Sequence, residues 1–507
     1  RSDRFSFLSS LDLSDDARFK VARNLDRIVN GSKTIISHPV LKDKSLDIIL
    51  KSWDKIYDHK IKTTLLPTTL LSMEAKNRSS ISPRSIAVPW KDRLSILDNS
   101  YENVKMNSFT VPCVDQLKFP NTMRLRPKSL REATTDLKSS TSSGLPYVQK
   151  KGLVRELMFK NFNHDFNKEY PCLLFTRTQE NEKTRNIWGY SSADTIQELR
   201  YFRVFQESFE SLLNFRSAID TPDSVDRAIT SLINNASKTG KQLLSIDFSV
   251  FDNTAKPPLV RLAFEYIKSC FQKEFHDGID GIFRRFTTVG IITPDGVKTG
   301  EHGIPSGSPG TNTIGSLVQY LIAQSFGVGD EDLQVQGDDG VYLVENPEKL
   351  ENYFESVGLS VNRNKGHISS NEVIYLQNFH SDVLRDNSGI CRGIYPTYRA
   401  LGRILYPERF TNYEKYDIKG SDFNSIRAIS ILENCKWHPL FVEFVEFIAK
   451  VVDRSLLEYS QKGLSNYSRY ISESSGLGRL FNYRIGSNLS GLNSFETVKI
   501  LARLRPS

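Results

Sequence analysis

The fold is decided by the stretch Leu333-Gln334-Val335-Gln336-Gly337-Asp338-Asp339-Gly340-Val341-Tyr342-Leu343-Val344. Two runs of β-forming residues flank a Gly-Asp-Asp turn, and this pattern predicts a β-hairpin with its acids at the turn. Another apolar run, Leu243 to Phe248, predicts a buried strand. It carries Asp247 near its C-terminal end, 91 residues before Asp338. Carboxylates that end neighbouring strands can converge on one point.

Three carboxylates at one point repel one another unless cations neutralise them. Hard oxygen ligands select Mg²⁺ or Mn²⁺. Two such ions about 3.5–4 Å apart stabilise the attacking and leaving oxygens of a phosphoryl displacement. Asp247, Asp338 and Asp339 are therefore candidate metal ligands for phosphoryl transfer. Each part of this pattern alone also fits ordinary surface acids, so the interpretation depends on the surrounding motifs.

The elements around these acids predict an α+β domain. Helices are expected from Pro257 to Phe271, from Thr311 to Ser325 and from Pro347 to Val357. Short strands are expected near Val361 and from Ile374 to Leu376. The resulting order, β-α-loop-α-β-β-α-β, describes an α+β domain with a small, mainly antiparallel sheet.

The flanking regions differ in character. Residues 10–60, residues 194–236 and the chain from about residue 400 are expected to be helical, because apolar residues recur there at helical spacing. Residues 64–150 are rich in Ser, Thr and Pro, so mostly loops and short strands are expected.

The composition is that of an ordinary globular protein. Of 507 residues, 39% are hydrophobic and 25% charged, which argues against a disordered or fibrous chain. No stretch offers the ~18 uninterrupted apolar residues of a membrane helix, and the first residues show no signal-peptide pattern. The five cysteines are far apart and form no Cys-x-x-Cys pair, so we expect reduced thiols in a cytosol-like compartment.

The formal net charge of +8 is modest for this length but unevenly distributed. From Lys118 to Lys160 there are ten basic residues against three acidic ones, and from Lys462 to Ser507 seven against two. Two basic zones on an otherwise balanced chain favour a polyanionic partner, although either zone alone also fits a solvated loop.

Six motifs occur in a recognisable order. They are Thr141-Ser142-Ser143-Gly144-Leu145-Pro146-Tyr147, Arg177-x5-Lys183-x-Arg185, Asp247-x4-Asp252, Ser306-Gly307-x3-Thr311, Gln336-Gly337-Asp338-Asp339, and Gly358 to Lys365. With these motifs the chain resembles viral RNA-dependent RNA polymerases, most of all those of double-stranded RNA viruses of the picobirnavirus and partitivirus kind. The resemblance runs from about Ser139 to Arg409.

The resemblance implies template-directed nucleotidyl transfer from NTPs with two Mg²⁺ or Mn²⁺ ions. Asp247 would ligate both ions, Asp338 would be the main ligand of the hairpin, and Asp339 an outer or second-metal ligand. Lys365 would be the general acid for the pyrophosphate leaving group, with His367 as the alternative.

The resemblance also implies residues that select and position the nucleotide. Asp252 would face the ribose 2′-hydroxyl, which distinguishes RNA from DNA. Many relatives carry Asn four residues after Thr311, where this chain has Gly315, so we expect Asn312 to help select the ribose. The whole set is Asp252, Ser306, Gly307, Thr311 and Asn312.

Two further motifs would contact phosphates. Arg177, Lys183 and Arg185 resemble the cations that lie over the incoming triphosphate, and they can face one groove if the segment is extended. The motif at residues 141–147 resembles a template-entry loop and lies in the first basic zone. Its expected template contacts are Ser142, Ser143, Gly144 and Pro146.

The fold implied by the resemblance is an α+β right hand of fingers, palm and thumb, with an antiparallel palm sheet and a closed fingers–thumb connection. The expected boundaries are 1–74 for an N-terminal extension bridging fingers and thumb, 75–240 for fingers, 241–271 for palm, 272–300 for a fingers insertion, 301–395 for palm and 396–507 for thumb.

The implied partners are a single-stranded RNA template, a double-stranded RNA product, NTPs and a capsid protein, with no membrane. The implied task is replication and transcription of a double-stranded RNA viral genome, in the virion and in host cytoplasm, started without a primer. A priming platform is expected between Tyr459 and Asn488, where Tyr467, Tyr470 or Tyr483 would stack under the first nucleotide. Ordinary packing roles for these tyrosines stay open.

Two alternatives remain at this stage. A reverse transcriptase uses the same palm and metals, but Gly337, Asp252 and the Ser-Gly-x3-Thr motif favour RNA synthesis. A non-catalytic RNA-binding protein of the capsid interior would use the basic zones without chemistry.

Overall fold

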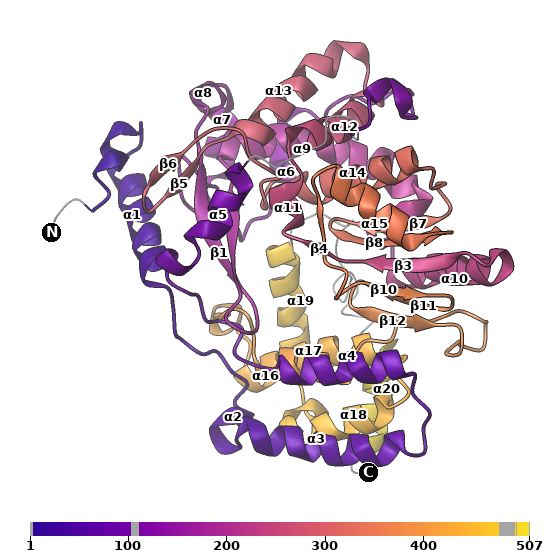
Figure 1. Cartoon of the computed structure of the whole chain (residues 1–507). Helices are drawn as coiled ribbons and strands as arrows, with labels where there is room; N and C mark the ends of the chain where they lie inside the picture. Colours follow the sequence, from indigo (N-terminus) through magenta and orange to yellow (C-terminus); the bar gives the residue numbers. More distant parts are fainter. Residues whose placement is uncertain (1–3, 103–110, 476–491, 493, 506–507) are drawn as a thin grey trace.

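The computed structural model describes residues 4–102, 111–475, 492 and 494–505. The chain folds as an α+β structure built around two four-stranded sheets (Figure 1). The helices are α1 (Asp15–Asn30), α2 (Val40–Asp43), α3 (Leu46–Ile61), α4 (Thr68–Ser79), α5 (Leu94–Tyr101), α6 (Leu130–Thr135), α7 (Lys151–Lys160), α8 (Phe162–Lys168), α9 (Ser192–Ser208), α10 (Pro222–Thr239), α11 (Phe251–Thr254), α12 (Pro257–Lys268), α13 (His276–Thr288), α14 (Thr311–Phe326), α15 (Pro347–Ser356), α16 (Thr397–Leu405), α17 (Gly420–Leu432), α18 (Phe441–Phe447), α19 (Gln461–Ser475) and α20 (Glu496–Leu504).

The strands fall into two larger sheets, ordered β2-β1-β5-β6 and β10-β3-β8-β7, and two small pairs, β11-β12 and β4-β9. Their bounds are β1 (Cys172–Thr178), β2 (Thr184–Gly189), β3 (Gln242–Ile246), β4 (Phe248–Ser249), β5 (Ile291–Thr293), β6 (Gly296–Lys298), β7 (Leu333–Gln336), β8 (Asp339–Val344), β9 (Ser360–Val361), β10 (His367–Ser369), β11 (Glu372–Tyr375) and β12 (Asn378–Ser381).

The sheet β10-β3-β8-β7 is antiparallel throughout and confirms the hairpin and the buried strand expected from the sequence. Apolar side chains of α10 cover one of its faces. The other face packs against α12, α14 and α15 (Figure 1). These three helices begin at the expected residues, Pro257, Thr311 and Pro347. A sheet buried on both sides gives the acidic turn a rigid base.

The sheet β2-β1-β5-β6 joins two distant parts of the chain. Strands β1 and β2 form an antiparallel hairpin, and β1 pairs in parallel with β5, which follows more than 100 residues later. Helix α1 packs on this sheet, where the Asn24 side-chain amide donates to the Leu174 carbonyl at 2.9 Å.

The C-terminal helices form a third body that includes α3 and α4 from the beginning of the chain (Figure 1). Trp53 of α3 is fully buried between Phe444 and Phe447. Its indole N–H donates to the Thr397 hydroxyl at 3.2 Å. The first 61 residues thus contact the β2-β1-β5-β6 sheet through α1 and the C-terminal helices through α3. The exact boundaries of fingers, palm and thumb stay a prediction.

Residues 64–150 depart from the expectation of loops and short strands, because they contain α4, α5 and α6. Helix α4 is held by contacts that its own sequence pattern does not reveal. The buried carboxylate of Glu74 accepts hydrogen bonds from the Thr397 hydroxyl at 2.5 Å and the Tyr398 N–H at 3.2 Å. Tertiary contacts therefore outweigh the weak local signal.

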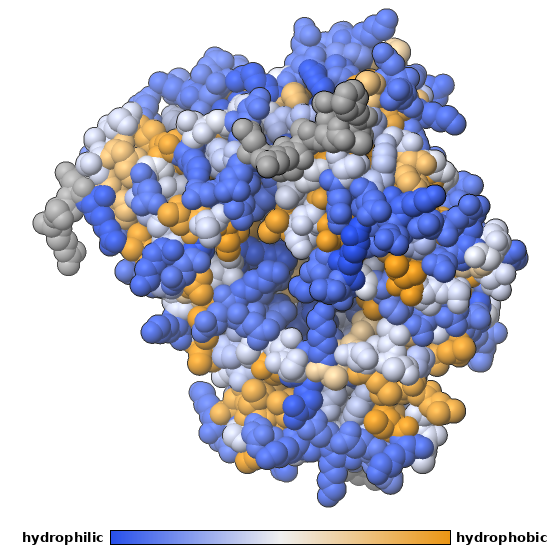
Figure 2. Space-filling model, in the orientation of Figure 1, coloured by the Kyte–Doolittle hydropathy of each residue, from blue (hydrophilic) through white to orange (hydrophobic). Residues whose placement is uncertain are grey.

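The helices, the cysteines and the surface show the general character of the molecule. Within the described residues, no helix combines the length and apolar character needed to cross a bilayer. All five cysteines are free thiols, four of them buried and Cys113 exposed. Figure 2 shows that the surface in the view of Figure 1 is largely hydrophilic and hollowed near its centre.

Candidate active site

The acidic turn and the end of β3 lie side by side. Ile246 pairs with Gly340, so the chain leaves β3 next to the β7–β8 turn and carries Asp247 there. Gly337 begins the turn with φ of 62°, a conformation that glycine adopts at little cost, and Asp338 is exposed at its tip. Burial raises the pKa of Asp247, and the charge of Asp338 raises it further. The negative charge of Asp338 therefore acts on the carboxyl group of Asp247.

Helix α14 holds the turn in place. The Ser316 hydroxyl accepts the Gly337 N–H at 2.8 Å, and the Gln319 side-chain amide donates to the Gly337 carbonyl at 2.6 Å. Gln319 is itself oriented by the Tyr342 hydroxyl, which donates to its side-chain oxygen at 2.7 Å. Gln319 also donates to the Asp339 carbonyl at 3.3 Å, so backbone groups on both sides of Asp338 are held in place.

A buried arginine supports the end of β7, which leads into this turn, and no sequence motif points to it. Arg216 and Glu210 form a fully buried ion pair at 2.9 Å. The Arg216 guanidinium also donates to the Val335 carbonyl at 2.9 Å and to the Asn312 side-chain oxygen at 2.8 Å. The one available signal was a cation close to apolar residues, with Phe215 before it and Ala218 and Ile219 shortly after it.

Asp339 is turned toward another element. Its Oδ2 accepts the Leu376 N–H at 2.9 Å, in the tight turn between β11 and β12. Burial raises its pKa to about 7, and the charges of Asp338 and Asp247 contribute. Over the part of the chain that the structure describes, no three His, Cys, Asp or Glu side chains are grouped to hold an ion by themselves. Asp247 and Asp338 are thus the central pair, and the outer or second-metal role of Asp339 stays a prediction.

Lysines face this pair of carboxylates. The charge of Lys365 opposes the rise in the pKa of Asp247, and Lys76 and Lys183 act in the same direction. Burial lowers the pKa of Lys183, with further lowering from Arg185 and Lys365, while Asp338 opposes it. Lys76 belongs to α4, the helix that was not expected, so sequence reasoning missed it. The positive charges of these lysines partly offset the negative charge of the carboxylates.

His367 is engaged elsewhere. Its Nε2 lies 3.1 Å from the Glu372 carboxylate, which also accepts a hydrogen bond from the Thr69 hydroxyl at 2.7 Å. Lys365 is exposed and electrostatically coupled to Asp247. His367 is therefore engaged by Glu372, and the general-acid role of Lys365 stays a prediction.

The three cations of the β1–β2 hairpin share one face. Arg177 lies opposite Arg185 in the ladder, so these two side chains point to the same side. Lys183 lies just before β2, where its carbonyl accepts the Gln179 N–H at 2.9 Å and continues the pairing, and it is two residues from Arg185. All are exposed, and Arg177 Nε pairs with Glu408 at 3.2 Å. The extended hairpin provides the common face expected from the sequence, while the triphosphate role stays a prediction.

Asp252 and Ser306 form a pair beside the carboxylates. The Ser306 hydroxyl donates to the Asp252 carboxylate. Burial raises the pKa of Asp252 to about 6, and the charge of Asp338 contributes. Thr311 does not join them, because its hydroxyl donates to the Pro305 carbonyl at 2.8 Å and closes its own loop.

The Ser-Gly-x3-Thr loop requires a glycine at position 307 because it packs closely against β2. Gly307 has φ of 134°, and a Cβ there would lie 2.2 Å from the Trp188 carbonyl oxygen of β2. The Trp188 N–H donates to the Ser306 carbonyl at 2.8 Å. The loop is therefore anchored to the β1–β2 hairpin.

Asn312 lies between the buried arginine and the acidic turn. Its side-chain oxygen accepts a hydrogen bond from Arg216. Its Nδ2 lies close to the turn, because a Cβ added to Gly337 would be 3.2 Å from it. Gly315 is buried one turn later, and a Cβ there would contact Phe251 at 3.4 Å and Gly337 at 3.5 Å. The amide of Asn312 thus borders the turn, and its part in ribose selection stays a prediction.

The loop at residues 141–147 is fixed against the end of β2. Ser143 and Gly144 are buried, and a Cβ on Gly144 would lie 2.1 Å from the Tyr190 carbonyl oxygen. These two residues therefore shape the loop rather than offer a surface. Ser142, Pro146 and Tyr147 are half-buried and Thr141 is exposed, so these four residues form the surface that the motif presents.

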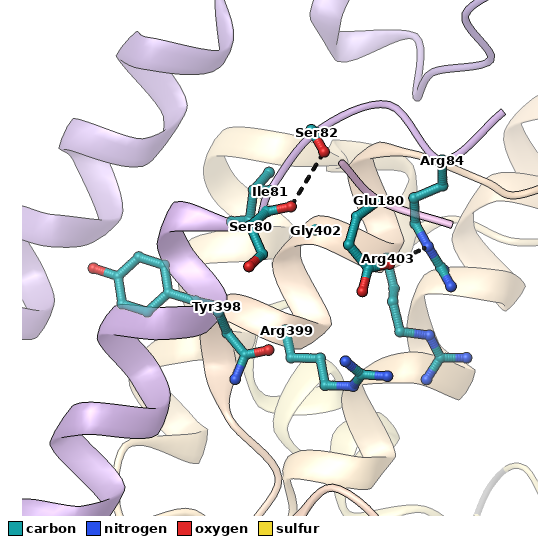
Figure 3. A pocket seen from close by; sticks show the side chains of 10 residues that line it. Ser80, Ile81, Ser82, Arg84, Glu180, Tyr398, Arg399, Gly402 and Arg403 are labelled. Carbon is teal, nitrogen blue, oxygen red and sulfur yellow. Dashed lines mark hydrogen bonds and ion pairs between the residues drawn. The ribbon is translucent and has the colours of Figure 1, made fainter. Parts of the chain in front are cut away.

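A pocket lies where the segment after α4, the β1–β2 turn and α16 meet (Figure 3). Arg84, Arg399 and Arg403 line it, and Arg84 Nε pairs with Glu180 at 3.3 Å. Asn181 of the same turn donates its N–H to the Ser82 hydroxyl at 2.8 Å. The pocket marks a direct contact between the hairpin that carries the three cations and the C-terminal helices.

Helix α19 projects from the C-terminal helices toward the centre of the molecule (Figure 1). Tyr467 is 5% exposed and packs against Phe423 and Tyr470, so it belongs to the core rather than to a stacking platform. Tyr483 lies outside the described residues.

Residues 98–449 match the family model described as "Viral RNA-dependent RNA polymerase". The potential RNA-dependent RNA polymerase of human picobirnavirus (strain Human/Thailand/Hy005102/-) is 27% identical over 455 residues, or 83% of each chain. The RNA-directed RNA polymerase of Cryptosporidium parvum virus 1 is 25% identical over 276 residues, which cover 48% of this chain and 52% of that one. The crystal structure of a human picobirnavirus polymerase superposes with a TM-score of 0.81 at 24% identity, covering 99% of both chains, and this likeness shows the fold.

Proposed function

Because the chain belongs to the viral RNA-dependent RNA polymerase family, we propose that it joins nucleotides by a two-metal mechanism centred on Asp247 and Asp338. The chain is an RNA-directed RNA polymerase with a right-hand fold. The observation that carries the finer proposal is the coupled pair of carboxylates at the end of β3 and in the β7–β8 turn, faced by lysines.

The donor set fits Mg²⁺ or Mn²⁺. Asp247 and Asp338 offer hard carboxylate oxygens, and the charge of Asp338 raises the pKa of Asp247, a repulsion that a bound cation would relieve. Mg²⁺ is usually held by one or two carboxylates together with substrate phosphates, so a closed cage of three protein ligands is not required. When bound, the ions supply charge stabilisation for the attacking and leaving oxygens.

The remaining residues position the substrate. Arg177, Lys183 and Arg185 present cations on one face to the triphosphate. The 3′-hydroxyl of the growing strand gives its proton to solvent water, its oxygen bonds to the α-phosphorus, and the bond from that phosphorus to the bridging oxygen of pyrophosphate breaks. Lys365 donates a proton to the departing pyrophosphate.

The Asp252–Ser306 pair would read the ribose. With its pKa near 6, Asp252 is ionised at neutral pH and accepts a hydrogen bond from the Ser306 hydroxyl. An ionised carboxylate also accepts one from a 2′-hydroxyl, which a deoxyribose lacks. Asn312 borders the same turn and would assist.

A primed RNA template with NTPs, or with dNTPs, tests this proposal. Extension with NTPs is expected to stop when EDTA removes divalent ions and to resume with excess Mg²⁺ or Mn²⁺. Extension with dNTPs is expected to be at least about a hundredfold less efficient, because the site is built to bond a hydroxyl. Equal use of dNTPs would favour the reverse-transcriptase alternative, and extension in EDTA would refute the metal mechanism.

We also propose that synthesis starts without a primer, supported by the position of α19, which reaches from the C-terminal helices toward the molecular centre. Replacing residues 476–488 by a Gly/Ser linker is expected to abolish unprimed starts and to spare primed extension. Loss of both, or of neither, would contradict a platform in this segment.

The similarity to a human picobirnavirus polymerase supports one further part of the proposal. The enzyme would replicate and transcribe a double-stranded RNA genome in the virion and in host cytoplasm, with a capsid protein as partner. Purified particles are then expected to incorporate NTPs without added template, and inert particles would count against a virion role.

A further inference from the structure

Three cations from separate segments meet beside the loop at residues 141–147. Lys138 lies in the turn after α6, Lys151 opens α7, and Arg203 projects from α9. The Lys151 ammonium donates to the Thr141 hydroxyl at 2.9 Å, and the Gly152 N–H donates to the Ser139 carbonyl at 3.1 Å. These bonds hold the loop that carries Lys138 against the start of α7.

A buried apolar cluster fixes the three segments relative to one another. It includes Leu137, Val154, Met158 and Leu199, which come from the same loop and from α7 and α9. The cations also influence each other. Burial lowers the pKa of Lys138, with a contribution from Arg203, and burial together with Lys138 lowers the pKa of Lys151 to about 8.

These cations have no carboxylate partner among the described residues. The nearby acids are engaged by other cations: Asp136 by Lys128 at 2.8 Å and Glu156 by Arg131 at 2.8 Å. Arg203 is 8% exposed, and its Nε and Nη1 are buried without a hydrogen-bond partner. Buried donors without acceptors are costly and rare, so this cluster is suited to an anion from outside the chain.

We propose that Lys138, Lys151 and Arg203 bind a phosphate of the single-stranded RNA template where it reaches the loop at residues 141–147. The forked donors of an arginine and two lysine ammonium groups match the oxygens of one phosphate. This inference rests on the proposed polymerase function and adds a template contact from residues outside the recognised motifs.

The position of the cluster favours template over nucleotide. Lys183 of the β1–β2 hairpin is coupled to Asp338 and Lys365, as expected for a group near the reacting phosphates. Besides burial, Arg203 lowers the pKa of Lys138, and Lys138 lowers the pKa of Lys151, so the charges that act on these lysines belong to the cluster itself. The cluster belongs to the loop after α6, to α7 and to α9, which pack together, whereas the carboxylates lie after β3 and in the β7–β8 turn.

Equilibrium binding of a fluorescein-labelled 12-nucleotide single-stranded RNA to the full chain, without NTPs, tests the proposal. Loss of one phosphate contact lowers the slope of log K against log salt by about 0.7, which corresponds to about fivefold weaker binding at 0.1 M salt. Lys151→Gln and Lys138→Gln are each expected to show this change. Lys160→Gln, at the exposed far end of α7, is the matched control and is expected to show neither change.

Thr141→Val separates charge from local structure. It removes the hydroxyl that accepts from Lys151 but keeps the ammonium, so the salt slope is expected to stay at the wild-type value. If Thr141→Val and Lys151→Gln weaken binding equally with an unchanged slope, the lysine is merely structural and the proposal is overturned. A raised KM for NTP with unchanged template affinity would assign the cluster to nucleotide and overturn it as well.

The outcome is distinguishable from failure of the proposed function. Wild-type protein that synthesises RNA while the lysine variants keep full affinity and slope refutes this inference alone. Wild-type protein that binds template but makes no product under any divalent ion refutes the polymerase mechanism and leaves the binding site standing.

Discussion

Arg216 shows how one side chain supports the acidic β7–β8 turn. It forms an ion pair with Glu210, donates to the β7 backbone and fixes the side chain of Asn312. None of these partners is near it in sequence except Glu210. A buried charge of this kind is tolerated only because every contact is in place.

Arg216→Met is expected to lower the free energy of unfolding by about 3–5 kcal/mol, because it leaves the Glu210 carboxylate buried and uncompensated. Denaturant unfolding measures the loss. The double variant Arg216→Met/Glu210→Gln removes that charge and is expected to recover a substantial part of it. A single variant within about 1 kcal/mol of wild type would contradict the role assigned to the pair.

Lys256 is a second buried cation, and it makes stability depend on pH. Its ammonium donates to the Asn99 carbonyl at 3.2 Å and the Ser100 carbonyl at 2.6 Å, and it is 6% exposed. Burial lowers its pKa from 10.5 to about 8. Between these two values the unfolded chain binds more protons than the folded one, so wild-type stability gains as pH rises through this window.

The gain disappears in Lys256→Met. The difference in unfolding free energy between wild type and Lys256→Met is expected to shift in favour of wild type by up to about 1.4 kcal/mol per pH unit from pH 8 to 10.5. Other titrating groups cancel in the comparison. A difference that stays flat over this range would show that the lysine titrates normally.

At the scale of elements, local patterns predicted the strands and helices around the acids. The β7–β8 hairpin, β3, and the helices that begin at Pro257, Thr311 and Pro347 follow from alternation, turn residues and start signals. Local patterns did not predict helix α4 or its Lys76, because α4 is stabilised by Glu74, which bonds to a residue more than 300 positions away. The same limit applies within the candidate site. Motif order predicted that Asp247 and Asp338 belong to it, whereas the bond of Asp339 to Leu376 depends on how two turns pack.

The loop of Gly307 gives a test at this scale. Gly307→Ala is expected to destabilise the fold by at least about 2 kcal/mol and to impair nucleotide addition, because the new Cβ meets the Trp188 carbonyl and φ is positive. Gly296→Ala is the matched control, since φ there is 122° and nothing lies within 4 Å. Equal effects of the two substitutions in thermal unfolding would mean that backbone conformation, not the contact with β2, requires the glycine.

The whole molecule places cations around an acidic centre. The basic zone at residues 118–160 includes Lys138 and Lys151 beside the loop at 141–147, and the β1–β2 hairpin adds three exposed cations. Asp247 and Asp338 lie at one end of the antiparallel sheet, after β3 and in the β7–β8 turn. The first 61 residues connect the sheet that carries the hairpin with the C-terminal helices. Such long-range connections cannot be deduced from local sequence patterns.

The connection depends on Trp53. Trp53→Ala is expected to lower the free energy of unfolding by about 3–5 kcal/mol, because the indole is fully buried between Phe444 and Phe447. Trp437→Ala, at a position 38% exposed, is the control and is expected to cost about 1 kcal/mol. Similar losses for the two variants in denaturant unfolding would remove Trp53 as an anchor.

The central claim is that Asp338 acts with Asp247 in nucleotide addition, and single-turnover extension of a primed RNA template by Asp338→Asn tests it most directly. The rate is expected to fall at least about a hundredfold while template affinity stays within about twofold of wild type, because the amide keeps the size of the side chain but not its charge. Asp330→Asn, an exposed position close in sequence, is expected to extend at the wild-type rate. Extension by Asp338→Asn at a rate close to wild type, with template still bound, would contradict the account.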